Sequence, residues 1–290
     1  MLPLAIHWNV DPVMFNIGSF GLRYYSFGFL FAFVLGYIIL TRIYKFEKIH
    51  LDYLDSLIVY IFLAVLVGAR LGHCLFYEPD YFLTSAHWTE MFWPFQDGQF
   101  TGFQGLASHG AAVAILLALW IYWKKYRMNP VWILDRMVIV VALGGAFIRL
   151  GNLFNSEIYG VETTLPWGFV FEQNGETVPK HPTQLYESLS YFTIFAVSLW
   201  YYIRKKGQFE TGSIFGWWLV ALFGMRLIIE FVKNDQVDFE AGMVLNMGQL
   251  LSLPFIIGGL VVAWLARKEK LPQGPFPQGE VMKHKESKKK

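Results

Sequence analysis

Charged residues and cysteines are scarce in this sequence of 290 residues. Only 16% of the residues are charged, compared with about 25% in soluble domains, whereas 55% are hydrophobic. The single cysteine, Cys74, excludes an intramolecular disulfide and a cysteine-rich metal site. The sequence contains neither an H-E-x-x-H zinc motif nor a G-x-S-x-G nucleophile motif. Neither a zinc protease nor an α/β serine hydrolase is therefore indicated.

Long apolar segments occupy most of the chain instead. A run of about 20 apolar residues is long enough to cross the hydrocarbon core of a bilayer. The sequence therefore predicts an all-α polytopic membrane protein with about seven transmembrane helices, at residues 18–40, 54–77, 106–123, 131–150, 184–203, 213–232 and 247–266.

Basic residues fall in alternate loops of this pattern. Of the 24 Lys and Arg residues, 17 follow the first, third, fifth and seventh segments. In contrast, residues 78–105 contain no Lys or Arg, and residues 151–183 contain only Lys180. Because basic loops stay in the cytoplasm, the pattern predicts an external N-terminus and a cytoplasmic C-terminus.

Two segments outside the apolar runs have their own composition. Residues 155–183 form the longest polar insertion, and Asn174-Gly175 between two extended runs is a hairpin signal. We expect a small external head there that contains a β-hairpin. Residues 271–290 are rich in Pro, Gly and Lys, which predicts a disordered basic cytoplasmic tail after a transmembrane domain at 1–270.

Arg70, Arg136, Arg149 and Arg226 fall within apolar segments, and an arginine at the centre of the bilayer costs about 2.5–3.5 kcal/mol on insertion scales. The predicted orientation places Arg70, Arg149 and Arg226 in the outer half of the membrane. Arg136 lies near the inner end of its segment, can reach the cytoplasmic interface, and is interpreted as structural. Three arginines at one depth indicate a protein interior or a wet cavity on the outer side.

Other polar residues share this depth. They include a histidine, a tyrosine, an amide and two carboxylates: Tyr25, His109, Asn152, Glu157 and Glu230. Arginine forks suit phosphate, and the simplest phosphate at this depth is a phospholipid headgroup. Each residue alone has a structural alternative, such as an Arg226–Glu230 pair at i,i+4 or an interfacial role for Tyr25. Their coincidence at one depth favours a site for an anionic ligand.

Seven motifs along the chain resemble those of one known family. Residues 149–160 (RLGNLFNSEIYG) resemble the signature of bacterial phosphatidylglycerol–prolipoprotein diacylglyceryl transferases. Further matches are RYY at 23–25, GARLG at 68–72, SHG at 108–110, HPTQLYE at 181–187, RLIIEF at 226–231 and MGQ at 247–249. The sequence departs from the family pattern at Ala111, Ile148, Ser156, Val161 and Leu222.

The resemblance implies a transferase of the bacterial cytoplasmic (inner) membrane, with its active site toward the outer face. It implies transfer of a diacylglyceryl group from phosphatidylglycerol to the lipobox cysteine of lipoprotein precursors, with release of glycerol 1-phosphate. The partners would be phosphatidylglycerol, precursor signal peptides and membrane lipids, without nucleic acid, cofactor or metal. His109, Arg149, Arg226 and Tyr25 are the expected catalytic residues. The expected substrate-binding residues are Arg70, Arg149, Asn152, Glu157, Gly160, Arg226 and Glu230.

Two other functions share part of this pattern. A secondary transporter also uses intramembrane charges, but here they cluster at an outer depth, and the halves of the chain show no repeat. A lipid phosphatase or another headgroup transferase would share the arginine clamp. The residue that takes the thiol proton is also open: His109 is the first choice, His181 is the rival, and the arginines alone could favour a thiolate.

The basic bias of the loops yields a prediction about topology. A reporter fused after Lys206 should be cytoplasmic, and one inserted within residues 174–177 should be external, because each follows the side set by the neighbouring Lys and Arg. Paired reporters active on opposite sides of the membrane measure this. The reverse pattern would contradict both the orientation and the outer placement of the arginines.

Overall fold

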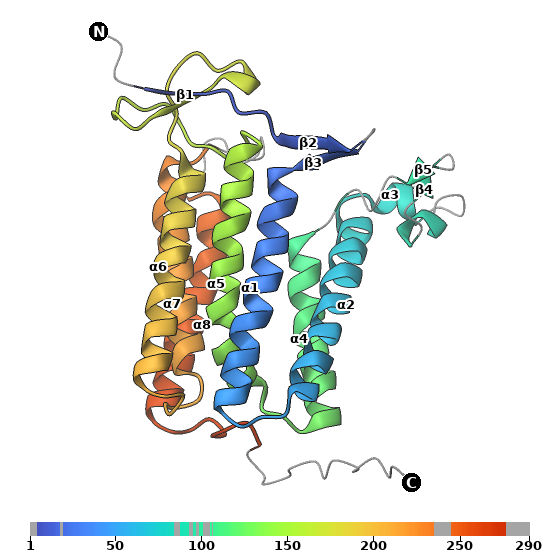
Figure 1. The fold of residues 1–290 in the computed structure, drawn as a ribbon, viewed down its shortest axis with the longest axis vertical. Helices are drawn as coiled ribbons and strands as arrows, with labels where there is room; N and C mark the ends of the chain where they lie inside the picture. Colours follow the sequence, from blue (N-terminus) through green and yellow to red (C-terminus); the bar gives the residue numbers. More distant parts are fainter. Residues whose placement is uncertain are drawn as a thin grey trace. The chain divides into compact units, whose positions relative to one another are not determined.

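The structure is a computed structural model, and it describes residues 5–17, 20–83, 88–92, 95–96, 99–100, 105, 107–234 and 245–276. The described chain is mostly helical and divides into two compact units (Figure 1). The first unit comprises Met1–Ile43 and Val131–Gly274, and the second comprises Tyr44–Pro130 and Pro275–Lys290.

All seven predicted apolar segments coincide with a long helix. These are α1 (Tyr24–Phe46), α2 (Leu51–Phe76), α4 (Ser108–Tyr126), α5 (Pro130–Phe154), α6 (Thr183–Arg204), α7 (Ser213–Ile229) and α8 (Met247–Arg267). Five of them are long and apolar enough to cross a membrane; the set leaves out α4 and α6. The first helix begins six residues later than predicted, because Phe20–Arg23 forms strand β3, which pairs with β2 (Val13–Ile17).

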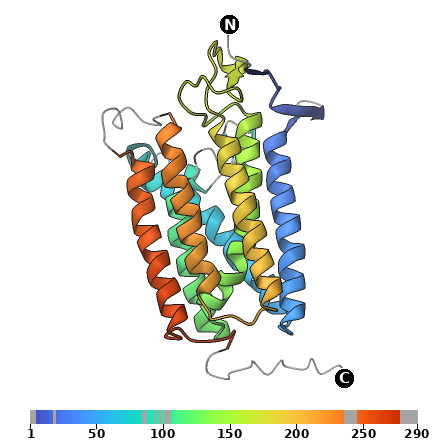
Figure 2. The same cartoon turned by 90° about the vertical axis from the view of Figure 1, so that its left-hand side faces the viewer.

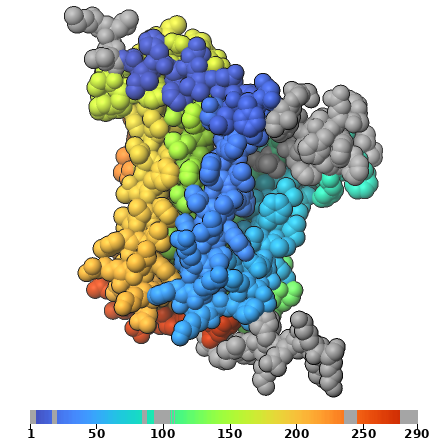
Figure 3. Space-filling view, in the orientation of Figure 1, coloured from blue at the N-terminus to red at the C-terminus, as the bar shows by residue number. Residues whose placement is uncertain are grey.

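Helix α5 is central to the first unit. Half of its most apolar stretch is buried, against 28% or less in the other four candidate spans. Figure 3 shows it as a narrow strip between α1 and α6. A Cβ on Gly28 of α1 would lie 3.0 Å from the Phe147 carbonyl oxygen, so glycine permits the close approach to α5. On the other side, the Ser188 hydroxyl of α6 donates to the Ala146 carbonyl at 3.0 Å.

Helices α7 and α8 pack side by side (Figure 2) through small residues. A Cβ on Gly216 would lie 2.6 Å from the Ala263 nitrogen, and one on Gly259 would lie 2.7 Å from the Gly216 carbonyl oxygen. Small residues at such positions let helix backbones approach, which is how helices associate in an apolar solvent.

The start of α7 is fixed by a buried carboxylate on α5. Asp135 accepts hydrogen bonds from the Gly212 N–H at 2.7 Å and the Phe215 N–H at 2.8 Å. These are amide groups that a helix start leaves without partners. The neighbouring Arg136 lies over the Trp132 and Phe209 rings, 4.2 and 4.8 Å from their centroids.

The second unit contains the α2–α4 pair. Gly68 and Gly72 of α2 face Gly110 of α4, where an added Cβ would lie 2.7 Å or less from the opposing backbone. The unit also contains α3 (Pro79–Phe82), the 3-10 helix η1 (Trp88–Met91), and the paired strands β4 (Phe95–Gln96) and β5 (Gln99–Phe100).

The polar segment 155–183 is built differently from the prediction. Strand β6 (Phe169–Phe171) pairs in parallel with β1 (Ile6–Trp8), and the 3-10 helix η2 (Glu172–Asn174) follows it. Only single antiparallel bridges join Lys180 to Phe169 and Glu162. The β-hairpin predicted at Asn174-Gly175 is therefore not confirmed, since η2 follows β6 directly and residues 176–179 form no second strand.

The predicted basic tail is described in its first residues only. Gln273 accepts a hydrogen bond from the Thr211 N–H at 2.9 Å, and the Gly274 N–H donates to the Thr211 hydroxyl at 3.2 Å. Residues 277–290 lie outside the described residues. The boundary at residue 270 stays a prediction.

The contact between α7 and α8 yields a matched pair of substitutions. Gly259→Ala should destabilise the folded protein by about 1–3 kcal/mol, because its methyl group meets the α7 backbone. Gly258→Ala adds the same methyl where no atom lies within 4 Å, so it should be neutral or slightly stabilising. Thermal unfolding in detergent measures both. Equal midpoints for the two variants would contradict this account of the packing.

Candidate functional site

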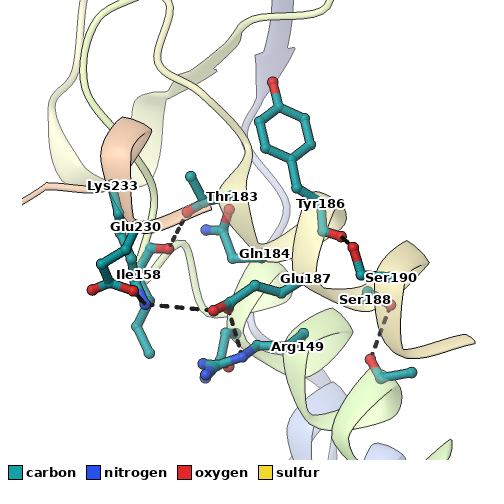
Figure 4. Close-up of polar contacts among 12 residues, drawn as sticks. Arg149, Ile158, Thr183, Gln184, Tyr186, Glu187, Ser188, Ser190, Glu230 and Lys233 are labelled. Carbon is teal, nitrogen blue, oxygen red and sulfur yellow. Dashed lines mark hydrogen bonds and ion pairs between the residues drawn. The ribbon is translucent and has the colours of Figure 1, made fainter. Parts of the chain in front are cut away.

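A buried ionic network joins α5, α6 and the chain that follows α7 (Figure 4). Glu187 of α6 lies between two cations: its Oε2 is 2.6 Å from Nε of Arg149, and its Oε1 is 3.6 Å from Nζ of Lys233. Nζ of Lys233 also lies 3.6 Å from Oε2 of Glu230. The side chain of Glu187 has no exposed surface. Removing one partner of such a buried pair costs about 3–5 kcal/mol, because a charge is left uncompensated.

The signature segment forms the other side of Arg149. The Arg149 Nη1 donates to the Asn152 side-chain oxygen at 3.1 Å, and the Asn152 Nδ2 donates to the Glu157 carboxylate at 2.7 Å. Asn155 donates to the same Glu157 oxygen at 3.2 Å. Glu157 thus contacts Arg149 through Asn152, whereas the carboxylate directly bonded to Arg149 is Glu187.

Helix α6 holds the backbone of this segment. The Gln184 amide donates to the Glu157 carbonyl at 2.7 Å, and the Thr183 hydroxyl donates to the Ile158 carbonyl at 2.8 Å. Ile158 has a φ of 62°, which is a strained conformation for a β-branched residue. Backbone strain of this kind persists only where surrounding contacts hold it, and it gathers at functional sites.

Residue 160 has to be glycine because the backbone of the segment after α7 lies too close for a side chain. A Cβ there would lie 2.0 Å from the Val232 carbonyl oxygen and 2.8 Å from the Cβ of His181. Gly160 forms an antiparallel bridge with Lys233, and its N–H donates to the His181 carbonyl at 2.8 Å. The glycine therefore allows the signature segment to lie against the chain that carries Lys233.

Arg226 of α7 and Arg149 of α5 share one neighbouring side chain, Tyr191. The Tyr191 side chain of α6 is close enough to both guanidinium groups to interact electrostatically with each. The Nε of Arg226 is buried and has no hydrogen-bond partner among the described residues. The Arg226 guanidinium therefore keeps donors that an anion could use.

Tyr25 and Glu230 each pack against a glycine of a neighbouring helix. The Tyr25 ring would lie 2.4 Å from a Cβ added to Gly151, so the phenol packs against the start of the signature segment. The Glu230 carboxylate would lie 2.6 Å from a Cβ on Gly248 of α8. No ion pair joins Glu230 to Arg226 within the described chain; Glu230 pairs with Lys233 instead.

Arg70 and His109 belong to the second unit. Nε of Arg70 donates to the Met91 carbonyl at 3.1 Å, and Nη2 donates to the Glu90 carbonyl at 2.8 Å. Its guanidinium also lies 4.8 Å from the centroid of the Phe82 ring. Arg70 thus joins α2 to η1. His109 is exposed in the first turn of α4.

His181 lies within the first unit, beside the signature segment. Its Nδ1 is 3.1 Å from the Tyr186 hydroxyl, which also accepts a hydrogen bond from the Trp167 indole at 3.0 Å. Burial lowers the pKa of His181, since it penalises the charged imidazolium. His181 is therefore biased toward the neutral form.

Sequence reasoning did not assign three residues of this network to the site: Glu187, Tyr191 and Lys233. Glu187 was visible as a carboxylate one turn inside an apolar segment, and such a residue in a membrane implies a cation partner. Lys233 stood among acidic residues of an outer loop, and only the fold brings it to Glu187. Tyr191 carries no signal that separates it from the other aromatic residues.

The fold and the site define a membrane protein with several apolar helices and a buried arginine–carboxylate network that can receive an anion. The family profile described as prolipoprotein diacylglyceryl transferase matches residues 12–265. The chain belongs to this family.

Curated relatives agree over nearly their whole length. A Bacteroides fragilis protein is 41% identical over 274 residues, covering 93% of this chain and 98% of the relative. A Tolumonas auensis protein is 42% identical over 266 residues, with coverage of 91% and 99%. A Porphyromonas gingivalis protein is 40% identical over 291 residues, with coverage of 94% and 98%. Each is named phosphatidylglycerol–prolipoprotein diacylglyceryl transferase.

Proposed function

We propose that this protein transfers the diacylglyceryl group of phosphatidylglycerol to the cysteine thiol of a lipoprotein precursor. A carbon–sulfur bond forms, the carbon–oxygen bond to the phosphate breaks, and glycerol 1-phosphate leaves with the bonding electrons. This is the first step of lipoprotein maturation, and the family match supports it. The observation that carries the proposal is the pair of cations beside Tyr191, one of which is held by Glu187 and Asn152.

The arginines act as a clamp for the lipid phosphate. Arg149 and Arg226 hold the phosphate and neutralise the charge that grows on the leaving group, where fixed donors are most effective. Asn152 orients Arg149 and hydrogen-bonds the headgroup, while Glu157 fixes Asn152. Tyr25 lines the site beside Gly151, and Gly160 lets the signature segment close over the chain after α7. Glu230 balances Lys233. Arg70 has a supporting role.

We place the protein in the bacterial cytoplasmic membrane with seven spans. Helices α4 and α6 cross the bilayer together with the five apolar candidates, which leaves the N-terminus outside and the C-terminus inside. Residues 155–183 then lie at the external face, and the ionic network lies in the outer half. This orientation suits the reaction, because the lipobox cysteine of an exported precursor reaches the outer side.

One assay distinguishes the transferase from the competing functions. Purified protein in detergent is incubated with phosphatidylglycerol and a lipobox peptide, and the products are identified by mass. A thioether-linked diacylglyceryl peptide is the expected product. Release of inorganic phosphate would assign a phosphatase, and the absence of any product would reject both enzymatic functions.

The same assay tests the clamp. Arg149→Lys and Arg226→Lys keep the charge but lose the planar fork, so each should lower kcat/KM by about tenfold or more. Arg204→Lys, at the inner end of α6, is the matched control and should keep wild-type activity. Wild-type turnover by both clamp variants would show that the arginines do not hold the phosphate.

Proton removal from the substrate thiol is assigned to His109. A free thiol has a pKa of about 8.5 and is mostly protonated at neutral pH, so a base that removes the proton speeds attack by the thiol on the lipid. In the wild type, the pH–rate profile should have an acidic limb, on which protonation of the catalytic base slows the reaction. His109→Gln should remove that limb and slow the reaction, whereas His181→Gln should retain it. If His109→Gln keeps the limb and most of the rate, the arginines favour the thiolate without a histidine base.

A further inference from the structure

The proposed clamp of Arg149 and Arg226 leaves Glu187, which pairs with Arg149, and Lys233, which pairs with Glu187, without a role in catalysis. Both side chains are buried: Lys233 is 2% exposed and Glu187 is not exposed at all. Each has two partners of opposite charge, since Glu187 contacts Arg149 and Lys233, while Lys233 contacts Glu187 and Glu230. The four charges form one chain, Arg149–Glu187–Lys233–Glu230, in which the signs alternate (Figure 4).

The chain controls how much positive charge Arg149 presents. Glu187 holds Arg149 through Nε, which fixes the direction of the guanidinium plane. If Glu187 paired with Arg149 alone, its negative charge would also weaken the attraction of Arg149 for an incoming phosphate. Lys233 lies beside the other carboxylate oxygen of Glu187, and its positive charge offsets part of the negative field of that carboxylate. Arg149 thus keeps both a fixed orientation and an attraction for an anion.

The position of Lys233 is set by the backbone of the signature segment. Gly160 bridges Lys233, and the Val161 N–H donates to the Val232 carbonyl at 3.0 Å. Because only glycine fits at residue 160, the segment that carries Asn152 and Glu157 also fixes the lysine. The clamp arginine is therefore held from two sides by one stretch of chain.

We propose that Glu187 and Lys233 are positioning residues that act through Arg149 to set its affinity for the lipid phosphate. This inference rests on the proposed function and names the groups that tune its clamp. Neither residue has to touch the precursor peptide. Their effect should therefore fall on the use of the lipid and leave the use of the peptide unchanged.

Glu187→Gln, Lys233→Met and the double variant test the proposal. Glu187→Gln leaves two buried cations without their carboxylate, and Lys233→Met leaves the carboxylate to Arg149 alone. Each single variant should raise the KM for phosphatidylglycerol by roughly tenfold, with the KM for the lipobox peptide unchanged. The double variant removes one charge of each sign. The fold increase in its KM for the lipid should be well below the product of the fold increases in the two single variants.

Lys180→Met is the matched control. Lys180 also bridges two carboxylates, at 3.4 Å from both Glu162 and Glu176, and neither of these carboxylates pairs with Arg149 or Arg226 within the described chain. It should keep the wild-type KM for both substrates. Thermal unfolding of all variants in detergent separates a loss of folded protein from a change in the clamp.

Three results would overturn the proposal. The first is an unchanged KM for the lipid in both single variants. The second is a double variant whose effect equals the product of the two single effects. The third is an equal effect on the KM for the lipid and on the KM for the peptide, which would mark a merely structural pair. The wild-type protein tests the proposed function separately, through the thioether product. If it forms none, the shift in thermal midpoint caused by phosphatidylglycerol still tests the network, since the single variants should reduce that shift and Lys180→Met should retain it.

Discussion

The contact between Arg149 and Glu187 is the constraint on which the site depends. An arginine in an apolar helix is costly, and a carboxylate with no exposed surface is costly as well. At 2.6 Å they neutralise each other, and the geometry is then completed by Asn152 on one side and Lys233 on the other. The strained Ile158 and the crowded Gly160 follow from this, because both lie where the chain turns back to reach α6 and the segment after α7.

The network also explains why the same residues serve stability and chemistry. Buried charges need partners, but an arginine whose donors were all used would have no attraction left for a phosphate. Here one arginine is held and the other keeps a buried donor free among the described residues. In the proposed clamp, this division would provide a rigid half and an open half of one phosphate site, which is the preorganisation that such chemistry requires.

Sequence reasoning located the helices well because length and apolarity decide them. Each of the seven apolar segments is a helix. The error at α1 arose because Phe20–Arg23 pairs with β2 as a strand, and apolarity alone does not separate a strand from a helix. Depth within the segments grouped Arg149, Asn152, Glu157 and Arg226, and hydrogen bonds join the first three of them. Depth alone could not choose partners, since that choice depends on which helix faces lie together. Glu187, Tyr191 and Lys233 were therefore not assigned to the site. The same limit led to the hairpin at Asn174-Gly175, where local turn chemistry gave way to pairing with β1.

The contact of Asp135 with the start of α7 is a common reference point for the positions of Arg149 on α5 and Arg226 on α7. Asp135 precedes Arg149 by 14 residues on α5, and Gly212 precedes Arg226 by 14 residues at the start of α7. At about 1.5 Å per residue, each arginine stands roughly 21 Å along its helix from the point where the two are joined. Fourteen residues are also close to four full turns, so each side chain leaves its helix on nearly the same side as its own anchor. The two arginines thus reach the same level along their helices because α5 and α7 are joined at the opposite end, about 21 Å away.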